Sequence, residues 1–472
     1  MNEYPMWIAG ESVRTSVAKQ VRMPYDDSVV GTVFEAGPAE VDRAIEAARK
    51  AAPLMRSLPR HRRSAILYRA QALLAERKDE IANILSSESG KPIREARVEV
   101  DRGIATLMFS AEEAHRLAGE EVPIDAHPAA PAGRMGMTIR EPLGVIAAIT
   151  PFNFPLNLSL HKIGPALAAG NTVVHKPATA TPITALLLAR VFHDAGLPAG
   201  ALNVVTGPGG VIGDLLTTDP RIAMITFTGS PDVGEGIGKR AGMKRVTLEL
   251  GSNSALILEA DADLEKAIPR CVAGAFANSG QVCISIQRIY AHASIRNAVA
   301  QRIAEGAAKL KIGHPLDDAT EVSSLISQNE ADRVSAWLAE AVAAGGKLLT
   351  GGTRTRNTIS PAVLTDVPAN VSISCREAFG PLVAIYSYDT LDEAIGLVNA
   401  SEFGLQAGIY TRDLENAFRA AREIQCGGVH INEVPAFRMD QMPYGGMKRS
   451  GTGREGPRYA IEEMSELKLI TW

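Results

Sequence analysis

The chain has 472 residues, of which 46% are hydrophobic and 22% are charged, and its mean hydropathy is +0.02. This composition is typical of a soluble globular protein, and the length suggests two or three domains. A net charge of −4 with both signs interspersed does not favour a nucleic-acid or membrane partner, and no apolar run approaches the roughly 18 residues that a membrane span needs.

The first third of the chain is helical in pattern. Apolar residues recur at three- and four-residue spacing over residues 39–55, 62–88 and 93–118, which predicts helices. From Leu143 onward, short continuous apolar runs alternate with helical stretches such as residues 181–195. Strands are predicted at 144–150, 171–177, 201–207, 223–229 and 246–252, and a second series follows with strands near 254–258, 288–292 and 383–387 and helices near 296–311 and 329–344.

Continuous apolar strands separated by helices indicate parallel sheets covered on both faces. The sequence therefore predicts an α/β fold with two α/β domains that join close to residues 249–252. The last residues, ELKLITW, read as a strand that could add to another sheet. Because open α/β sheets bind ligands at the carboxyl ends of their strands, the polar residues at these ends are the functional candidates.

Two candidates follow the first two of these strands. Asn153 stands between two aromatic residues and two prolines in PFNFP, and its amide could donate a hydrogen bond to a developing oxyanion. An asparagine that serves a tight turn is the alternative. Lys176 ends the strand NTVVHKP and suits a ribose hydroxyl or a phosphate, unless it is a solvated surface lysine.

Four more candidates lie at later strand ends. In FTGSPDVG, Gly229 allows close backbone approach, and Ser230 can cap a helix whose N-terminus attracts a phosphate. Glu249 stands among leucines, where desolvation raises the pKa of a carboxyl toward that of a general base, unless it faces water at a sheet edge. Glu377 in CREAFGP could accept hydrogen bonds from ribose hydroxyls or cap a turn.

The four cysteines form no CxxC pair, so the sequence predicts no metal site, and a reducing cytoplasm does not favour disulfides. Cys271, Cys375 and Cys426 are interpreted as core or near-core residues. Cys283 follows the small and polar run ANSGQV and is the candidate nucleophile. A thiol, a carboxylate base, an amide donor and a phosphate-binding helix end together permit thiohemiacetal formation followed by hydride transfer.

Eight motifs stand in the order typical of one enzyme family: TPFNFP, AAGNTVVHKPA, ITFTGS, LELG, FANSGQVC, EAFGP, FGLQAGIYT and MPYGGMKRSGTGREG. On these motifs the chain resembles the aldehyde dehydrogenase superfamily over nearly its whole length. The resemblance implies a Rossmann-like cofactor domain, a catalytic α/β domain and a small oligomerisation β-sheet. The implied parts are an NAD(P)-binding domain (1–118 and 143–249), a catalytic domain (250–435), oligomerisation strands (119–142 and 465–472) and a return segment that closes the substrate funnel (436–464).

The same resemblance implies the roles of site residues. Cys283 is the nucleophile, Glu249 activates the water that hydrolyses the thioester and can assist in deprotonating the thiol, and Asn153 forms the oxyanion hole with the backbone N–H of Cys283. Lys176 and Glu377 hold ribose hydroxyls. Ser230 and its helix N-terminus hold the pyrophosphate, and the remaining implied cofactor contacts are Thr150, Pro151, Phe152, Thr179, Gly209, Phe227, Gly229, Val233, Leu250 and Phe379.

Three positions depart from the commonest family pattern. Phe152 stands where many members have tryptophan, and Ser252 replaces the second glycine of ELGG. Thr179 stands three residues after Lys176, where NAD-preferring members often carry a glutamate that repels a 2′-phosphate. Without that glutamate, we predict that the protein uses both NAD and NADP.

The substrate prediction uses three residues. His161 occupies the place where succinate-semialdehyde members carry an arginine for the distal carboxylate, and Arg438 lies in the loop that closes the funnel. Together they suggest a small aldehyde with a polar or anionic far end, and a packed helix histidine with a surface arginine is the alternative. Val282 stands where non-phosphorylating glyceraldehyde-3-phosphate enzymes place an arginine, which disfavours that substrate. The middle section is most similar to lactaldehyde and succinate-semialdehyde dehydrogenases.

The main hypothesis is NAD(P)-dependent oxidation of a small polar aldehyde to its carboxylate. A CoA-acylating aldehyde dehydrogenase is the nearest rival, but such enzymes typically lack the glutamate base. A non-catalytic relative would be expected to lose Cys283, Glu249 or Asn153, and a cysteine hydrolase needs a histidine partner that the sequence does not identify. The start of the chain lacks a signal-peptide pattern, so we expect a cytoplasmic protein, and the resemblance implies a homodimer or homotetramer.

Overall fold

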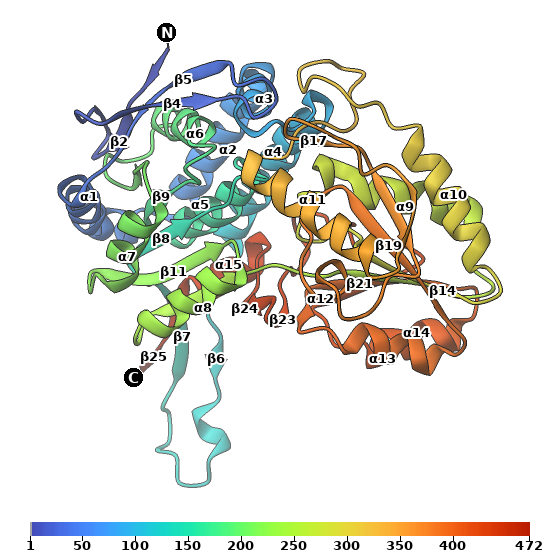
Figure 1. Cartoon of the computed structure of the whole chain (residues 1–472). Coiled ribbons are helices and arrows are strands. Elements are labelled where there is room, and N and C mark those ends of the chain that lie inside the picture. The colour runs from blue at the N-terminus through green and yellow to red at the C-terminus, as the bar shows by residue number, and fades with distance from the viewer. Residues whose placement is uncertain (1) are drawn as a thin grey trace.

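The computed structural model describes residues 2–472, which form two α/β lobes and a projecting hairpin (Figure 1). The first lobe is built on an eight-stranded sheet in which the strands from β12 to β10 run parallel. In spatial order the sheet contains β24 (Gly451–Thr452), β12 (Arg245–Glu249), β11 (Ile222–Thr228), β8 (Val145–Ile149), β9 (Thr172–Lys176), β10 (Leu202–Val204), β2 (Met6–Ile8) and β3 (Glu11–Val13). The predicted parallel strands of this lobe are confirmed.

Both faces of this sheet are buried. Ile146 and Ala148 of β8 join one apolar cluster, whereas Val145, Ala147 and Ile149 join another on the opposite face. This alternation explains why β8 and β9 read as continuous apolar runs. The covering helices are α1 (Pro38–Ser57), α2 (Arg60–Glu76), α3 (Lys78–Ser89), α4 (Ile93–Arg116), α5 (Asn157–Ala169), α6 (Ile183–Asp194), α7 (Gly209–Thr218), α8 (Pro231–Arg240) and α15 (Pro457–Glu463).

The helical stretch predicted over residues 62–88 is not continuous. Helix α2 ends at Glu76, Arg77 leaves the helical conformation with φ −105° and ψ 18°, and α3 begins at Lys78. Leu74 and Ile81 on the two sides of the break pack into the same core. The apolar spacing therefore continues across the break and does not reveal it.

The N-terminal region is strand rather than helix, which the sequence pattern did not indicate. Strands β1 (Glu3–Tyr4), β5 (Val29–Phe34) and β4 (Ala18–Arg22) form a small sheet in that order, while β2 and β3 extend the main sheet in antiparallel fashion. Most residues of β3 and β4 are exposed, so they lack the apolar runs that mark buried strands.

The second lobe contains a seven-stranded sheet. In spatial order its strands are β15 (Lys347–Thr350), β18 (Ala362–Thr365), β19 (Leu382–Tyr388), β14 (Arg288–His292), β13 (Ala255–Leu258), β21 (Gln406–Tyr410) and β22 (Gly428–Ile431). Its helices are α9 (Leu264–Phe276), η2 (Ala277–Gly280), α10 (Arg296–Ala308), α11 (Gln328–Ala343), α12 (Ser372–Cys375), α13 (Leu391–Asn399) and α14 (Leu414–Glu423). Two small two-stranded sheets also occur. One pairs β16 (Arg354–Thr355) with β17 (Thr358–Ile359), and the other pairs β20 (Phe403–Gly404) with β23 (Met447–Lys448).

The last part of the chain returns to the first lobe. Strand β24 pairs with β12, and α15 packs against α5. Strand β25 (Ser465–Thr471) then pairs along β7 (Gly136–Pro142), which also pairs with β6 (Glu121–Val122), and η1 (Ile124–Ala126) follows β6. The predicted terminal strand is thus present, and the β6–β7 hairpin projects away from the body (Figure 1). No helix within residues 2–472 has the length and apolar character needed to cross a membrane.

Candidate active site

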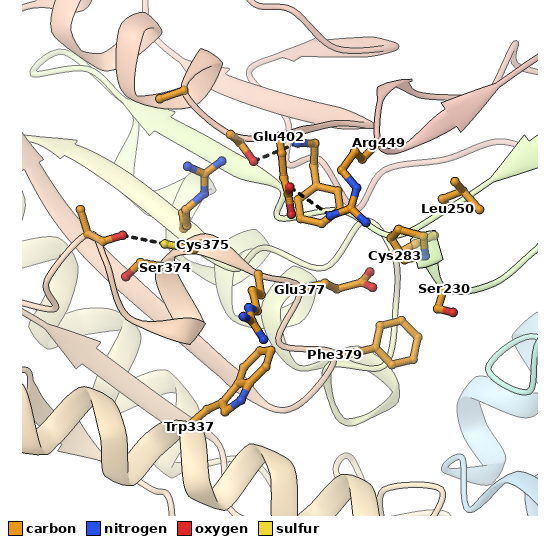
Figure 2. Close-up of a pocket in the computed structure, with 18 of the residues that line it drawn as sticks. Ser230, Leu250, Cys283, Trp337, Ser374, Cys375, Glu377, Phe379, Glu402 and Arg449 are labelled. Carbon is orange, nitrogen blue, oxygen red and sulfur yellow. Dashed lines mark hydrogen bonds and ion pairs between the residues drawn. The ribbon is translucent and has the colours of Figure 1, made fainter. Parts of the chain in front are cut away.

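A cavity of about 1510 Å³ is lined by residues of both lobes, at the carboxyl ends of β11 and β12 and beside the loop that follows β8. Figure 2 shows Glu377 and Phe379 projecting toward the space that lies between Cys283 and Ser230. Most residues predicted for the site line this cavity: Pro151, Phe152, Asn153, Gly229, Ser230, Glu249, Leu250, Cys283, Glu377 and Phe379.

Cys283 follows a tight turn that explains the small residues before it. Asn278, Ser279 and Gly280 have φ of 50°, 56° and 73°. A Cβ on Gly280 would lie 2.0 Å from the carbonyl oxygen of Gly380, so only glycine fits there. The Cys283 thiol is half-buried, its Sγ lies 3.0 Å from the Tyr444 hydroxyl oxygen, and burial raises the pKa of the thiol to about 11. The turn therefore brings the sulfur to the cavity wall.

Asn153 is buried next to this turn. One N–H of its side-chain amide donates to the backbone carbonyl of Gln281 at 3.0 Å, and the backbone carbonyl of Asn153 accepts from the Asn278 side-chain amide at 3.2 Å. The amide oxygen Oδ1 has no hydrogen-bond partner within residues 2–472. Because an amide carries two N–H donors, one remains available to a ligand in the cavity.

Glu249 ends β12 and is only 2% exposed, so it does not face water as the alternative interpretation had it. Neither carboxylate oxygen finds a hydrogen-bond partner in the described part of the chain. Burial first, and then the nearby Glu455 carboxylate, raise the pKa of Glu249 well above its ordinary value. A carboxyl of this kind holds its proton into a higher pH range and is a stronger base once it is ionised.

Glu455 is the opposite case. It accepts from Lys162 Nζ at 2.7 Å and from Arg438 Nη2 at 3.1 Å. Burial opposes ionisation, but these two cations lower the pKa of Glu455 to about 2. Of these two glutamates, Glu455 is ionised and paired with two buried cations, whereas Glu249 holds its proton to a higher pH.

Glu377 and Phe379 form the opposite wall. Glu377 Oε1 accepts from the backbone N–H of Ser252 at 3.0 Å, and burial raises the pKa of Glu377 to about 7. A Cβ on Gly251 would lie 2.3 Å from Glu377 Oε2, so this close approach requires glycine. The rings of Phe379 and Phe152 meet edge to face with their centres 5.8 Å apart.

Ser230 is the N-cap residue of α8, as predicted from FTGS, but its hydroxyl makes no capping hydrogen bond. Gly229 lies directly against the Phe227 ring, because a Cβ there would come within 2.4 Å of the ring. Val233 is exposed on α8. The N-terminus of this ten-residue helix is thus open toward the cavity.

Several predicted cofactor residues do not line the cavity: Thr150, Lys176, Thr179, Gly209, Phe227 and Val233. Lys176 ends β9, next to Ile149 of β8, so it lies at the same edge of the sheet. Its ammonium donates to the carbonyl of Pro177 at 3.0 Å, and burial lowers the pKa of Lys176 to about 8. Thr150 bonds to His175 at 3.0 Å, and Thr179 donates to the Gly207 carbonyl at 3.0 Å.

The two tentative substrate residues also lie outside the cavity lining. His161 is completely buried, and its Nε2 lies 3.0 Å from Asp440 Oδ1. Arg438 is not the surface arginine of the alternative interpretation, since its side chain is 6% exposed. Its guanidinium lies 3.6 Å from the centre of the Tyr444 ring, whose hydroxyl contacts the sulfur.

The aldehyde dehydrogenase family profile matches residues 7–470. This chain belongs to the aldehyde dehydrogenase family. It is therefore an oxidoreductase that acts on aldehydes, and the resemblance seen in the sequence motifs is confirmed.

Relatives and solved structures agree with this family over the full length. The chain is 47% identical to a 3-sulfolactaldehyde dehydrogenase from Priestia aryabhattai, over 100% of this chain and 98% of the relative. It is similar to aldehyde dehydrogenase 21 from Physcomitrella patens in complex with the reaction product succinate, with 40% identity, a TM-score of 0.97 and coverage of 100% and 98%. An NADP-dependent glyceraldehyde-3-phosphate dehydrogenase from Bacillus halodurans complexed with NADP superposes with a TM-score of 0.98 and 35% identity, over 100% of this chain and 99% of that chain.

Three residues of this aldehyde dehydrogenase site were missed in the sequence: Lys162, Tyr444 and Glu455. Lys162 offered a signal, since it is a charged residue in a mostly apolar stretch, and the whole of helix α5 is buried. Tyr444 and Glu455 stand in the motif MPYGGMKRSGTGREG, but nothing in its spacing brings them to Cys283. One other prediction is wrong, because Cys375 is exposed at the cavity margin rather than near the core.

Proposed function

We propose that this aldehyde dehydrogenase oxidises a small polar or anionic aldehyde to its carboxylate with NAD or NADP, through a thiohemiacetal and a thioester on Cys283. The observation that carries the proposal is that Cys283, Asn153 and Glu249 line one cavity, although they come from three separate segments of the chain. A nucleophile, an amide donor and a carboxylate base within one cavity fit acyl-transfer chemistry.

The residues at the sheet edge fit a dinucleotide. The buried Lys176 ammonium pairs with no carboxylate in residues 2–472, and the Ser230 hydroxyl at the start of α8 makes no capping bond. These donors would hold ribose hydroxyls and phosphates, and Glu377 would accept from ribose hydroxyls. When bound, NAD(P) supplies the hydride acceptor. The similar B. halodurans enzyme was solved in complex with NADP, and Thr179 here adds no charge against a 2′-phosphate.

The chain's own groups perform the remaining chemistry. Cys283 Sγ adds to the aldehyde carbon, and the charge that develops on the carbonyl oxygen is held by the Asn153 amide and the Cys283 N–H. After oxidation, Glu249 in its ionised form takes a proton from water, and the resulting hydroxide attacks the thioester carbon. The C–S bond then breaks, and the carboxylate product leaves.

Two buried cations that act on Glu249, namely Lys162 and Arg438, support an anionic substrate. Both cations bind the Glu455 carboxylate, and the Asp440 carboxylate, whose pKa is lowered despite burial by His161 and Arg102, also acts on Arg438. The names of the relatives agree, since 3-sulfolactaldehyde carries a sulfonate and succinate a second carboxylate. We propose 3-sulfolactaldehyde, lactaldehyde and succinate semialdehyde as the first substrates to test.

The test is a panel of these aldehydes and their neutral analogues, followed by nicotinamide absorbance with NAD and with NADP, with and without CoA. We expect oxidation of the anionic aldehydes with both cofactors and release of the free acid without CoA. A strict CoA requirement with a CoA thioester as product would contradict the hydrolytic role of Glu249. Equal kcat/KM for neutral and anionic analogues would contradict the charge argument.

We further propose a cytoplasmic homodimer or homotetramer that assembles through the arm formed by β6, β7 and β25. Leu467 and Leu469 on β25 are 54% and 57% exposed, which is costly for apolar side chains in a monomer. Light scattering of the full chain, compared with the Leu467→Glu variant, measures the assembly directly. A wild-type monomer would contradict this assignment.

A further inference from the structure

Tyr444 touches the sulfur of Cys283, and neither the sequence nor the proposed function gives it a role. Its hydroxyl oxygen lies 3.0 Å from Cys283 Sγ. The ring is 2% exposed and packs with Val282, Ile284 and Leu405. The return segment thus delivers a phenol hydroxyl to the reacting atom.

A pair of backbone hydrogen bonds and a stacked cation hold this phenol in place. The backbone N–H of Tyr444 donates to the Glu455 carbonyl at 3.0 Å, and the N–H of Glu455 donates to the Tyr444 carbonyl at 2.6 Å. The Arg438 guanidinium lies 3.6 Å from the ring centre and binds the Glu455 carboxylate at 3.1 Å. Because both the backbone and the stacked cation are anchored on Glu455, the hydroxyl is positioned before a substrate arrives.

The hydroxyl is a donor and not a base. Burial, and then the neighbouring Cys283, raise the pKa of Tyr444 well above 10, so the phenol keeps its proton. The other charged groups that face the thiol are Glu377, Glu249 and Arg438. Burial and the two glutamates raise the pKa of Cys283, whereas the Tyr444 hydrogen bond and Arg438 lower it. The Tyr444 hydrogen bond lowers this pKa more than the guanidinium does.

We propose that the Tyr444 hydroxyl is a catalytic hydrogen-bond donor to the Cys283 thiolate, both when the sulfur attacks the aldehyde and when it leaves the thioester. The inference rests on the proposed function. The thiol proton passes to ionised Glu249, which releases it to water in the cavity before the thioester is hydrolysed, while the phenol proton stays on Tyr444. As the S–C bond forms, the carbonyl electron pair moves to oxygen and the sulfur loses its charge. When the C–S bond breaks after water has added, the electron pair returns to sulfur and the same hydroxyl stabilises the departing thiolate.

The experiment measures the thiolate without turnover. Cys283 is alkylated with iodoacetamide over the neutral and alkaline pH range, and its modification is followed by peptide mass spectrometry, which separates it from the other three cysteines. In Tyr444→Phe, which keeps the ring under Arg438, we expect alkylation about tenfold slower at neutral pH, since a hydrogen bond to a charged group is lost. The curve should shift to higher pH and reach the same plateau, and kcat should fall while KM changes little.

Two matched proteins decide between donation and packing. Tyr388→Phe removes another buried hydroxyl, bonded to the Leu258 carbonyl at 3.1 Å, and should leave Cys283 alkylation unchanged. Replacement of Tyr444 by 3-fluorotyrosine makes the donor more acidic, so alkylation should be faster than in the wild type at neutral pH. If Tyr444→Phe does not fold, the alkylation rate of the 3-fluorotyrosine protein still distinguishes hydrogen-bond donation from packing.

The role of Tyr444 would be overturned if Tyr444→Phe left the pH dependence of Cys283 alkylation unchanged. It would also be overturned if 3-fluorotyrosine shifted that dependence in the same direction as phenylalanine does. Neither measurement needs an aldehyde or a cofactor. Failure of the proposed function would show itself differently, as aldehyde oxidation that survives in Cys283→Ser.

Discussion

Several polar atoms at the cavity wall around Cys283 lack partners in the part of the chain that the structure describes, whereas the charged side chains in the layer behind this wall form ion pairs. At the wall, Asn153 Oδ1 and both oxygens of Glu249 have no partner among the described residues. In the layer behind, Lys91 pairs with Glu99, Lys162 with Glu455, and Arg102 with Asp440. Unpaired buried polar atoms are costly, and those at the wall are placed where a ligand could pair with them, whereas the paired charges hold the wall in position.

The supporting layer acts on the wall through the backbone. Glu99 Oε1 accepts from the N–H groups of Leu156 at 2.9 Å and Asn157 at 3.1 Å, just after the loop that carries Asn153. Glu95 Oε2 accepts from the N–H of Asn278 at 2.7 Å, in the turn before Cys283. One helix, α4, therefore fixes both the amide and the thiol. Changes at the wall should affect turnover, and changes in the layer should affect stability.

The largest effect is expected at the wall. Cys283→Ser removes the thiolate and should reduce aldehyde oxidation by at least about a thousandfold, because a serine hydroxyl does not ionise without a strong base. The thermal midpoint should stay close to that of the wild type. Initial rates, followed by the nicotinamide absorbance, measure the loss of activity. Undiminished oxidation would show that Cys283 is not the nucleophile.

Glu249→Gln should lower kcat by about a thousandfold, within the range of general base catalysis. The raised pKa of Glu249 means that the folded protein keeps a proton that the unfolded chain has lost above its ordinary value of 4.5. The stability that this group contributes is full below that pH and decreases as the pH rises toward its folded value. Glu249→Gln should therefore have a higher thermal midpoint than the wild type, and the difference should grow from acid to alkaline pH.

Melting curves of both proteins at several pH values check the sign. Wild-type turnover should also rise with pH through the range in which Glu249 ionises, because its base form becomes populated. A thermal difference that shrinks as the pH rises would show that Glu249 is not the proton-holding carboxyl of the site.

Lys91→Met tests the supporting layer. It leaves the completely buried Glu99 carboxylate without its cation and should lower the free energy of unfolding by about 3 to 5 kcal/mol. The matched double variant Lys91→Met/Glu99→Gln should recover part of this loss, since it removes the uncompensated charge. Chemical denaturation measures both, and equal losses in the single and double variants would contradict the paired-layer interpretation.

The smallest effect is expected at the sheet edge. If Thr179 lies near a bound 2′-phosphate, as we propose, Thr179→Glu should raise KM for NADP about tenfold with little change for NAD. Steady-state kinetics with each cofactor check this. A wild-type enzyme that already prefers NAD strongly would contradict the argument from Thr179.

Much of the catalytic site could be predicted from the sequence because strand ends and glycines are local signals. Asn153, Glu249 and Cys283 each follow or end a recognisable element, and all three line the cavity. The charged partners were harder to find. Tyr444 and Glu455 lie in a motif rich in glycines and charges. Only the return of that segment to β12 brings Tyr444 to the sulfur and Glu455 to Lys162.

The amino-acid sequence by itself determined the α/β alternation, the parallel strands and the family, because buried strands and close backbone approaches restrict which residues can follow one another. Tertiary structure alone decided the protonation of the site. Whether Glu249 or Glu455 is ionised depends on which of them meets Lys162 and Arg438, and these residues come from distant parts of the chain. Local sequence determines the backbone conformation, whereas the pKa of an ionisable side chain depends on the groups that the fold packs around it.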